Sequence, residues 1–178
     1  MSWQTAMSAG AAATLPRMTI RPAEDRDSEA RAGFLERWHS LRVARLGALE
    51  HPLDHPALVA ERDGRLVGVL TYIVRGADCE VLTLHVDDRR QRLGTALIAE
   101  VKEIARRAGC TRVWLITTND NVDALRFYQR RGFRLAALHP GAVNDSRARL
   151  KPEIPEIGEH GIPIRDEIEL EQEIGDNS

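Results

Sequence analysis

Residues 89–97 read Arg-Arg-Gln-Arg-Leu-Gly-Thr-Ala-Leu, and this stretch combines the residue types that bind a phosphate group. It joins a hydrophobic, strand-like segment at 81–86 to the beginning of a long amphipathic segment at Leu93. The first turn of a helix leaves backbone N–H groups without intrahelical partners, and the helix dipole favours negative charge there. Three arginines beside such a turn predict a phosphate site. The residues alone also fit a structural strand-to-helix turn with solvated arginines.

The segment after this turn has the spacing of a helix that is buried along one face. Apolar residues follow Leu93 at steps of four, four, three and four: Leu97, Val101, Ile104 and Ala108. Arg106 and Arg107 complement the negative end of the helix dipole, and Gly109 provides a left-handed residue that ends the helix. The sequence therefore predicts a strand at 81–86, a turn, and a helix at about 93–108.

The rest of the chain alternates short apolar segments with helix-like ones. Turn dipeptides such as Asp63-Gly64 separate the apolar segments and favour hairpins. Strands are predicted at 18–21, 58–61, 66–74, 80–86, 113–117, 133–138 and 166–171, and helices at 28–40, 93–108 and 121–131. The segment 41–50 fits either a continued helix or a short strand, and 139–165 is expected to be a long irregular section. This order predicts an α/β (α+β) fold, a mixed sheet with helices on both faces.

The length of 178 residues suits one domain with a sizeable core. Residues 1–16 are rich in Ala, Ser and Gly and are expected to be a flexible leader. The domain is expected at 17–172, and residues 173–178 are expected to be a flexible tail.

Charge is distributed unevenly along the chain, although its net value is only −2. Residues 153–178 hold nine acidic side chains and one Arg, whereas the rest of the chain holds 24 basic and 18 acidic ones. A nucleic-acid-binding domain would be more basic, and aromatic residues are only 4% of the chain, so we expect no nucleic-acid partner. The acidic region fits either attraction of a cationic substrate or a solvated surface.

The cysteines and the hydropathy indicate the cellular setting. Cys79 and Cys110 suggest neither a disulfide framework nor a metal site, and both read as small buried hydrophobes. No stretch approaches the ~18 apolar residues that a membrane helix needs. We therefore expect a cytoplasmic protein without a metal and without a membrane segment.

Two segments together resemble one family, the GNAT superfamily of N-acetyltransferases. The turn at 89–94 is similar to the family's acetyl-coenzyme A signature, Q/R-x-x-G-x-G/A. Residues 121–133, Asn-Val-Asp-Ala-Leu-Arg-Phe-Tyr-Gln-Arg-Arg-Gly-Phe, are similar to its next motif, in which an Asn precedes Ala-Leu-x-Phe-Tyr and Gly-Phe. The resemblance covers about 58–138, roughly half of the chain. One departure is Arg92, which stands where the family usually has Gly.

The resemblance implies a central sheet that is splayed between two strands, at 82–86 and 113–117, and acetyl-CoA as the cofactor. Backbone N–H groups of the turn would hold its diphosphate, with the Thr95 hydroxyl as a further donor. Free backbone groups of the splayed strand would pair with the pantetheine arm, and Asn121 would bond to it. Asn121 also fits a simple helix N-cap. The implied cofactor-binding residues are Leu84, Val86, Gln91, Arg92, Leu93, Gly94, Thr95, Asn121 and Tyr128.

Tyr128 takes the place of the family's general acid, which protonates the leaving thiolate. A Tyr with its ring in the core and its hydroxyl at the rim is the structural alternative. Glu80 is the first candidate for the base, because it stands four residues before Leu84, where some branches of the family carry a catalytic Glu. Strict alternation puts it on the same face as Leu82 and Leu84, and partial burial would raise its pKa. A solvent-exposed Glu at the entry of the strand is the structural alternative. His85 is the second candidate, and water is the third.

The resulting hypothesis is an N-acetyltransferase that moves the acetyl group of acetyl-CoA to a primary amine by direct attack. The acceptor is an unidentified small molecule or peptide, and residues 139–165 are expected to shape its side of the site. The alternative is a catalytically silent module of the same fold that binds or senses acyl-CoA. The sequence leaves open whether two copies associate into a homodimer.

Overall fold

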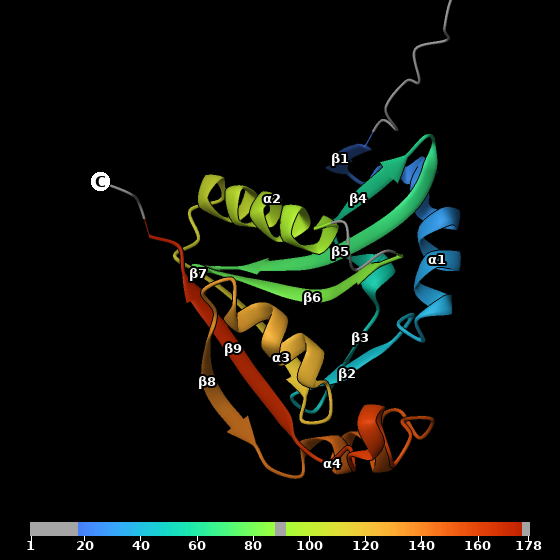
Figure 1. Ribbon diagram of the computed structural model, residues 1–178, viewed down its shortest axis with the longest axis vertical. Helices are drawn as coiled ribbons and strands as arrows, with labels where there is room; N and C mark the ends of the chain where they lie inside the picture. Colours follow the sequence, from blue (N-terminus) through green and yellow to red (C-terminus); the bar gives the residue numbers. More distant parts are fainter. Residues whose placement is uncertain (1–17, 88–91, 176–178) are drawn as a thin grey trace, which may run out of the picture.

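A seven-stranded mixed sheet is the centre of this computed structural model, which describes residues 18–87 and 92–175 (Figure 1). The strands follow the order β1-β4-β5-β6-β7-β9-β8 across the sheet. Their bounds are Met18–Pro22 (β1), Ala57–Arg62 (β4), Arg65–Arg75 (β5), Asp78–Val86 (β6), Arg112–Thr118 (β7), Arg134–His139 (β8) and Glu167–Glu173 (β9). This arrangement confirms the predicted single α/β domain with a mixed sheet.

The sheet opens between its two parallel neighbours, β6 and β7. Backbone pairing joins them only where Asp78–Glu80 meets Arg112–Trp114. Beyond these residues the two strands diverge, as Figure 1 shows, while β6 stays paired with β5 and β7 with β9. The predicted splay between 82–86 and 113–117 is confirmed.

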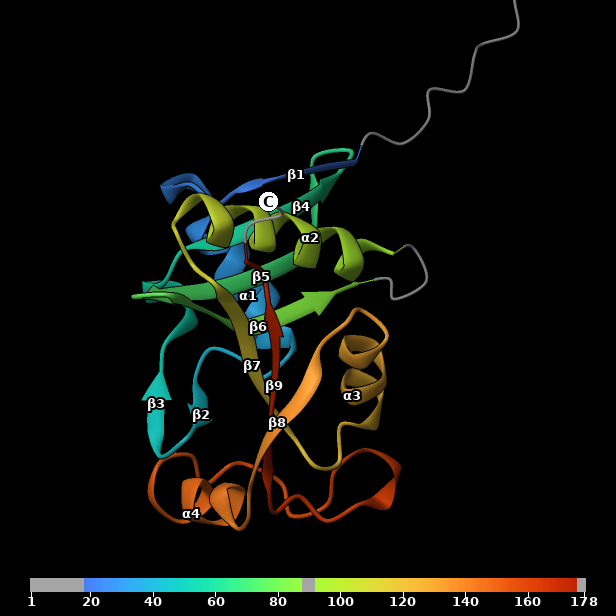
Figure 2. The ribbon, with the colours of Figure 1, turned by 90° about the vertical axis from the view of Figure 1, so that its left-hand side faces the viewer.

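Helices cover both faces of the sheet, as the view in Figure 2 shows. The helices α2 (Leu93–Arg107) and α3 (Val122–Gln129) pack on one face, and α1 (Ser28–Arg37) packs on the other. A small hairpin of β2 (Val43–Arg45) and β3 (Ala48–Glu50) follows α1. The remaining helical elements are α4 (Ala142–Arg149) and the 3-10 turns η1 (Asp25–Asp27), η2 (Pro52–Asp54) and η4 (Glu159–Gly161).

Two hydrophobic clusters hold these layers together. The larger one joins α2, α3 and the strands beneath them, with Leu97, Val101 and Leu170 fully buried. The smaller one packs Phe34 and Leu35 of α1 against the opposite face of the sheet. The predicted apolar face of α2 therefore supplies the main core, and this fixes the helix whose first turn was predicted to bind phosphate.

A β-bulge in β6 makes the expected strict alternation wrong. Thr71 pairs with Thr83 but Tyr72 pairs with Val81, so Leu82 is an extra residue in β6. Val81 and Leu84 consequently both pack against the α2 cluster. Glu80 faces the opposite side of the sheet, where it bonds to a side chain of β2, rather than sharing a face with Leu84 as expected.

The segment 41–50, which the sequence left open, forms the β2–β3 hairpin, in agreement with the short-strand alternative. Two further expectations need correction. The section expected to be irregular contains the helix α4. This helix has only one buried apolar residue, Val143, so it carries little periodic signal. The domain also extends past residue 172, because β9 ends at Glu173 and the buried Ile174 donates its N–H to Thr111 O (2.8 Å). Residues 1–17 and 176–178 lie outside the described ranges.

Replacement of Leu97 by Ala tests the central role of the α2 cluster. Leu97 is fully buried, so we expect a loss of about 2–5 kcal/mol in the free energy of unfolding, measured by urea denaturation. Leu138 on the edge strand β8 is 60% exposed, and Leu138→Ala is the matched control, with an expected change below about 0.5 kcal/mol. Equal losses in the two variants would contradict this assignment of the core.

Candidate functional site

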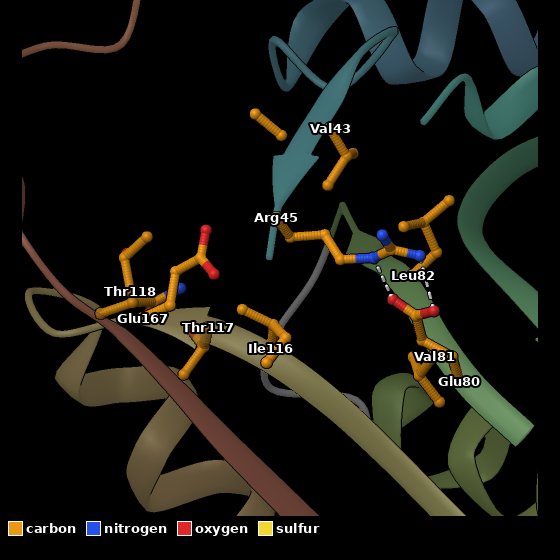
Figure 3. A pocket seen from close by; sticks show the side chains of 11 residues that line it. Val43, Arg45, Glu80, Val81, Leu82, Ile116, Thr117, Thr118 and Glu167 are labelled. Atoms are coloured by element: carbon orange, nitrogen blue, oxygen red, sulfur yellow. Dashed lines mark hydrogen bonds and ion pairs between the residues drawn. The ribbon is translucent and has the colours of Figure 1, made fainter. Parts of the chain in front are cut away.

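A cavity of about 210 Å³ lies beside the point where β6 and β7 separate (Figure 3). It is bounded by the hairpin strand β2 on one side and by β6, β7 and β9 on the others. Its lining residues are Val43, Ala44, Arg45, Glu80, Val81, Leu82, Ile116, Thr117, Thr118, Asn121 and Glu167. The opening in the sheet therefore leads to a partly open space with both apolar and charged walls.

Glu80 is held in this cavity by Arg45. Arg45 Nε lies 2.5 Å from Glu80 Oε1 and Nη2 lies 2.8 Å from Oε2, so both carboxylate oxygens accept from one guanidinium. Arg45 also donates to Glu50 (3.1 Å). The side chains of Arg45 and Glu80 are almost fully buried, at 7% and 4% exposure, so the pair is charge-assisted and shielded from water. It leaves little of the Glu80 carboxylate available to take a proton from another molecule.

A second buried carboxyl, Glu167, enters the cavity from the first residue of β9. The residue is only 1% exposed, and Figure 3 shows its carboxylate pointing into the space beside Arg45. Its Oε2 accepts a hydrogen bond from Leu46 N (2.8 Å). Burial raises the pKa of the Glu167 carboxyl, and the Leu46 N–H offsets part of that effect.

Asn121 is the N-cap of α3, as the simpler of its two predicted roles requires, and it also lines the cavity. Its Oδ1 accepts from Ala124 N (3.1 Å) at the beginning of α3. The cap directs the end of β7 into the helix that carries Tyr128. The hydrogen bond to Ala124 accounts for one acceptor lone pair and leaves the amide N–H₂ group as a donor.

The structure describes the predicted phosphate-binding turn only from Arg92 onward. Gln91, one of its predicted residues, lies outside the described residues. Arg92 is the N-cap of α2 and has φ 56°, the left-handed conformation that glycine adopts without strain. This explains why the related signature usually has Gly here. Leu93 and Gly94 are buried at the helix entrance, and a Cβ at Gly94 would lie 3.1 Å from Phe127 Cζ. The absence of a side chain at Gly94 thus allows α2 and α3 to approach each other.

A cation also lies between the beginning of α2 and the end of α3. Arg131 Nε is 2.9 Å from Thr95 Oγ1, and the Arg131 guanidinium stacks 3.5 Å from the centre of the Phe127 ring. Arg131 Nη1 donates to Phe127 O (2.7 Å). The Thr95 hydroxyl oxygen accepts from Arg131, which leaves its O–H to donate as predicted.

The predicted pantetheine-binding strand has an open edge. Leu84 and Val86 pair with β5 on one side, opposite Leu70 and Gly68. On the other side, pairing with β7 ends at Glu80, so within the described residues the edge of 81–86 that faces β7 has no partner strand. An open edge, a helix entrance and an adjacent cation together fit a ligand with a diphosphate and an extended arm carrying amides.

The predicted general acid, Tyr128, is buried in the α2–α3 cluster at 7% exposure. Its ring makes edge-on contacts with Phe127 and Phe133, at centroid distances of 5.0 and 5.4 Å. Burial raises the pKa of the Tyr128 phenol well above its usual range, so it keeps its proton at neutral pH. The ring position matches the structural alternative, and a buried protonated phenol is also what a proton donor requires.

His85, the second predicted base, lies outside the residues that line the cavity. Its ring stacks on Trp38 at a centroid distance of 5.1 Å, and its Nε2 is 2.8 Å from Ser40 Oγ. Ser40 Oγ donates to Trp38 O (3.0 Å), so it accepts from His85, and Nε2 is the protonated nitrogen. His85 therefore holds the end of α1 against β6, and Glu80 is the predicted base that reaches the cavity.

Comparisons with known proteins agree with this geometry. The model of the acetyltransferase (GNAT) family matches residues 20–133, and the chain belongs to this family. It is 52% identical over 116 residues to the uncharacterized protein YdhI of Bacillus subtilis, covering 65% of this chain and 71% of that one. It is 41% identical over 92 residues to the mycothiol acetyltransferase of Clavibacter michiganensis, covering 49% of this chain and 30% of that one.

Solved structures share the fold at low sequence identity. A Bacillus subtilis acetyltransferase in complex with CoA has a TM-score of 0.64 at 19% identity, covering 88% of this chain and 99% of that one. The Salmonella typhimurium protein yncA, solved with acetyl-CoA, has a TM-score of 0.64 at 18% identity, covering 90% and 96%. Among the described residues, no helix has the length and apolar character that crossing a bilayer requires.

Sequence reasoning missed Arg45 and Glu167, two of the three charged residues that line the cavity. Arg45 lies in the segment 41–50, whose structure was ambiguous. Glu167 shares the alternation of Glu169 and Glu171 along the last strand, and no pattern separates it from them. Glu167 differs from Glu169 and Glu171 only in the folded protein, where it is buried and accepts a hydrogen bond from Leu46 N beside β2.

Removal of Arg45 tests the buried ion pair. Arg45→Met leaves the Glu80 carboxylate buried without its partner, so we expect a loss of about 3–5 kcal/mol in the free energy of unfolding. The double variant Arg45→Met/Glu80→Met should recover most of that loss, because no uncompensated charge remains. Urea denaturation of the single and double variants measures both values, and additive losses would refute a coupled pair.

Replacement of Arg92 by Gly separates backbone strain from ligand binding. The change removes strain at a positive φ but adds freedom to the unfolded chain, so the free energy of unfolding should change by less than about 1 kcal/mol. Loss of the guanidinium should weaken CoA binding by about tenfold in low salt, measured by calorimetry. Unchanged affinity would show that the Arg92 side chain is directed away from the phosphates.

Proposed function

We propose that this protein transfers the acetyl group of acetyl-CoA to a primary amine by direct attack. The proposal is carried by one observation, the opening between β6 and β7, which places an unpaired strand edge beside a cavity with buried carboxyls. The donor supplies an activated acetyl thioester. The acceptor amine would approach through the cavity and meet the thioester in the opening.

We propose that the first turn of α2 binds the donor diphosphate. The backbone N–H groups of Leu93, Gly94 and Thr95, the Thr95 hydroxyl and the nearby Arg131 would stabilise its negative charge. The edge of β6 near Leu84 and Val86 would pair with the pantetheine amides. A backbone N–H there would also polarise the thioester carbonyl as negative charge develops on its oxygen.

We propose that Tyr128 donates the proton that the leaving thiolate takes. Its phenol is buried and protonated, and it is carried by the helix that closes one side of the opening. On the other side of the sheet, Glu80 is proposed to help orient the amine while Arg45 fixes its carboxylate. The two groups would then act on opposite sides of the reacting carbonyl carbon.

Both cysteines support a reducing compartment for this activity. Cys79 and Cys110 are buried free thiols, and burial raises the pKa of the Cys79 thiol to about 12. Such thiols are inert as nucleophiles, so they take no part in the proposed transfer. We propose that the protein works in the cytoplasm.

The proposed reaction can be tested by incubation of the protein with acetyl-CoA and pooled primary amines while free thiol is measured. We expect amine-dependent thiol release and an acetylated amine detectable by mass spectrometry. Tight binding of CoA without amine-dependent thiol release would instead support the silent acyl-CoA-binding module.

Tyr128→Phe tests the proton donor. We expect a fall in kcat of about 100-fold, within the range that general acids contribute, with little change in the Kd of CoA. Tyr72→Phe, which removes the other tyrosine hydroxyl of the chain, is the matched control and should retain normal turnover. A normal kcat in Tyr128→Phe would leave the phenol with a packing role only.

A further inference from the structure

Glu167 forms no ion pair within the described residues, although Arg45 and His139 lie close enough to act on its charge. Its neighbours along β9, Glu169 and Glu171, both form ion pairs with Arg112. No basic side chain in the described ranges 18–87 and 92–175 lies within ion-pairing distance of Glu167, although it is only 1% exposed. Burying a carboxylate without a counter-ion is costly, so this position is destabilising unless another molecule supplies the positive charge.

The other charges of the cavity do not remove this imbalance. Arg45 reaches into the cavity, but it is shared between the carboxylates of Glu80 and Glu50. Glu50 also pairs with Arg75 (3.2 Å) and His55 (2.9 Å). With Arg45 and Arg75 set against Glu80, Glu50 and an ionised Glu167, the acidic side chains still outnumber the arginines by one. A cationic ligand with one compact charged end is complementary to this excess of acidic side chains.

The wall of the cavity formed by β2 is supported by a later part of the chain. We call residues 140–166, which include α4, the strap. Lys151 Nζ of the strap donates to the carbonyl oxygens of His39 (3.0 Å) and Arg42 (2.7 Å), and Glu153 forms an ion pair with Arg42. These contacts join the strap to the segment that leads into β2.

We propose that the acceptor is a small alkylammonium ion and that Glu167 binds its charged nitrogen and takes a proton from it. This inference rests on the proposed acetyl transfer and deepens it, because it names the acceptor class and the base. A volume of about 210 Å³ suits an amine of a few carbon atoms rather than a peptide chain.

The proton balance of the step is complete. The ammonium gives one proton to the Glu167 carboxylate, and the nitrogen lone pair then forms the C–N bond as the C–S bond breaks. The thiolate takes the proton of Tyr128, and the second nitrogen proton restores the Tyr128 phenol. Glu167 finally releases its proton to water.

The electrostatic surroundings of Glu167 suit this role. Burial raises its pKa towards the range of a working base, and the Leu46 N–H, His139 of β8 and Arg45 of β2 each oppose that rise. Glu80 on β6 is the other titratable group of the cavity. The groups around Glu167 therefore offset part of the rise in its pKa that burial causes.

The test compares two amines that differ in their own pKa values. Butylamine carries an alkylammonium that titrates near ~10, and glycinamide carries an α-ammonium that titrates near ~8. For Glu167→Gln we expect kcat/KM at neutral pH to fall about 100-fold for butylamine but only about tenfold for glycinamide. The loss should shrink as the pH approaches ~10, because butylamine then deprotonates in water. Glu173→Gln, at the exposed end of the same strand, is the matched control.

Several results would overturn the proposal. Equal losses for the two amines, or the larger loss in Glu80→Gln, would assign proton removal elsewhere. Faster acetylation of an alanine-initiated hexapeptide than of butylamine would refute the small acceptor. Glu167→Asp keeps the carboxyl group but shortens the side chain by one methylene, so we expect a rate between those of the unaltered protein and the Gln variant. This variant replaces Glu167→Gln in the test if the Gln variant is poorly folded.

A binding measurement keeps this inference separate from the proposed function. If no amine is acetylated, the proposed function fails, and calorimetry with butylammonium on the CoA-saturated protein still tests the site. We expect binding at least tenfold weaker in Glu167→Gln than in the unaltered protein, and equal or absent binding in both would refute the site.

The stability of the Gln variant gives a third measurement. Because the folded-state pKa of Glu167 is raised, ionisation destabilises the fold increasingly as the pH rises above about 4, and the effect is absent below that pH. Glu167→Gln should therefore be more stable than the unaltered protein at pH 7 and equal to it at pH 3. A variant that is less stable at pH 7 would indicate a purely structural carboxyl.

Discussion

The separation of β6 from β7 is the constraint on which the rest of the structure depends. Two parallel strands would normally pair along their length, but here pairing ends at Glu80. The extra residue Leu82 shifts the side chains of β6 at this point and increases the local twist. The result is a strand with one paired edge and one open edge, held in place by the packing of α2 on one face and the β2–β3 hairpin on the other.

The two sides of this opening use electrostatics in opposite ways. On the α2 side, backbone N–H groups and the partly exposed Arg131 offer positive charge to an anionic ligand. On the β2 side, Arg45, Glu80 and Glu167 are buried, so each charge carries a large desolvation penalty. An ion-pair or hydrogen-bond partner is needed to offset that penalty. In the proposed reaction, a large anion and a small cation would therefore be directed to opposite sides of the reacting carbon.

Most of the fold could be predicted from the sequence because its signals are local. The apolar spacing of α2, the turn residues between β4 and β5, and the Asn121 cap each specify their own element. The bulge at Leu82 could not be predicted, since it arises from pairing with β5 and leaves the hydrophobic pattern of β6 intact. The motifs likewise located Gly94 and Tyr128, which depend on sequence neighbours. Arg45 and Glu167 could not be predicted, because they are 122 positions apart in the sequence and only the folded chain brings them to one cavity.

The position of β9 between β7 and β8 has a consequence for the biogenesis of the protein. β8 precedes β9 along the chain, yet it pairs with no other strand of the described sheet, so it has no place until β9 inserts beside β7. A nascent chain that has left the ribosome only as far as α4 can assemble β1 to β7 but still lacks one wall of the cavity. Such long-range insertion is slow, and it exposes the unsatisfied edge of β7 to other chains during translation.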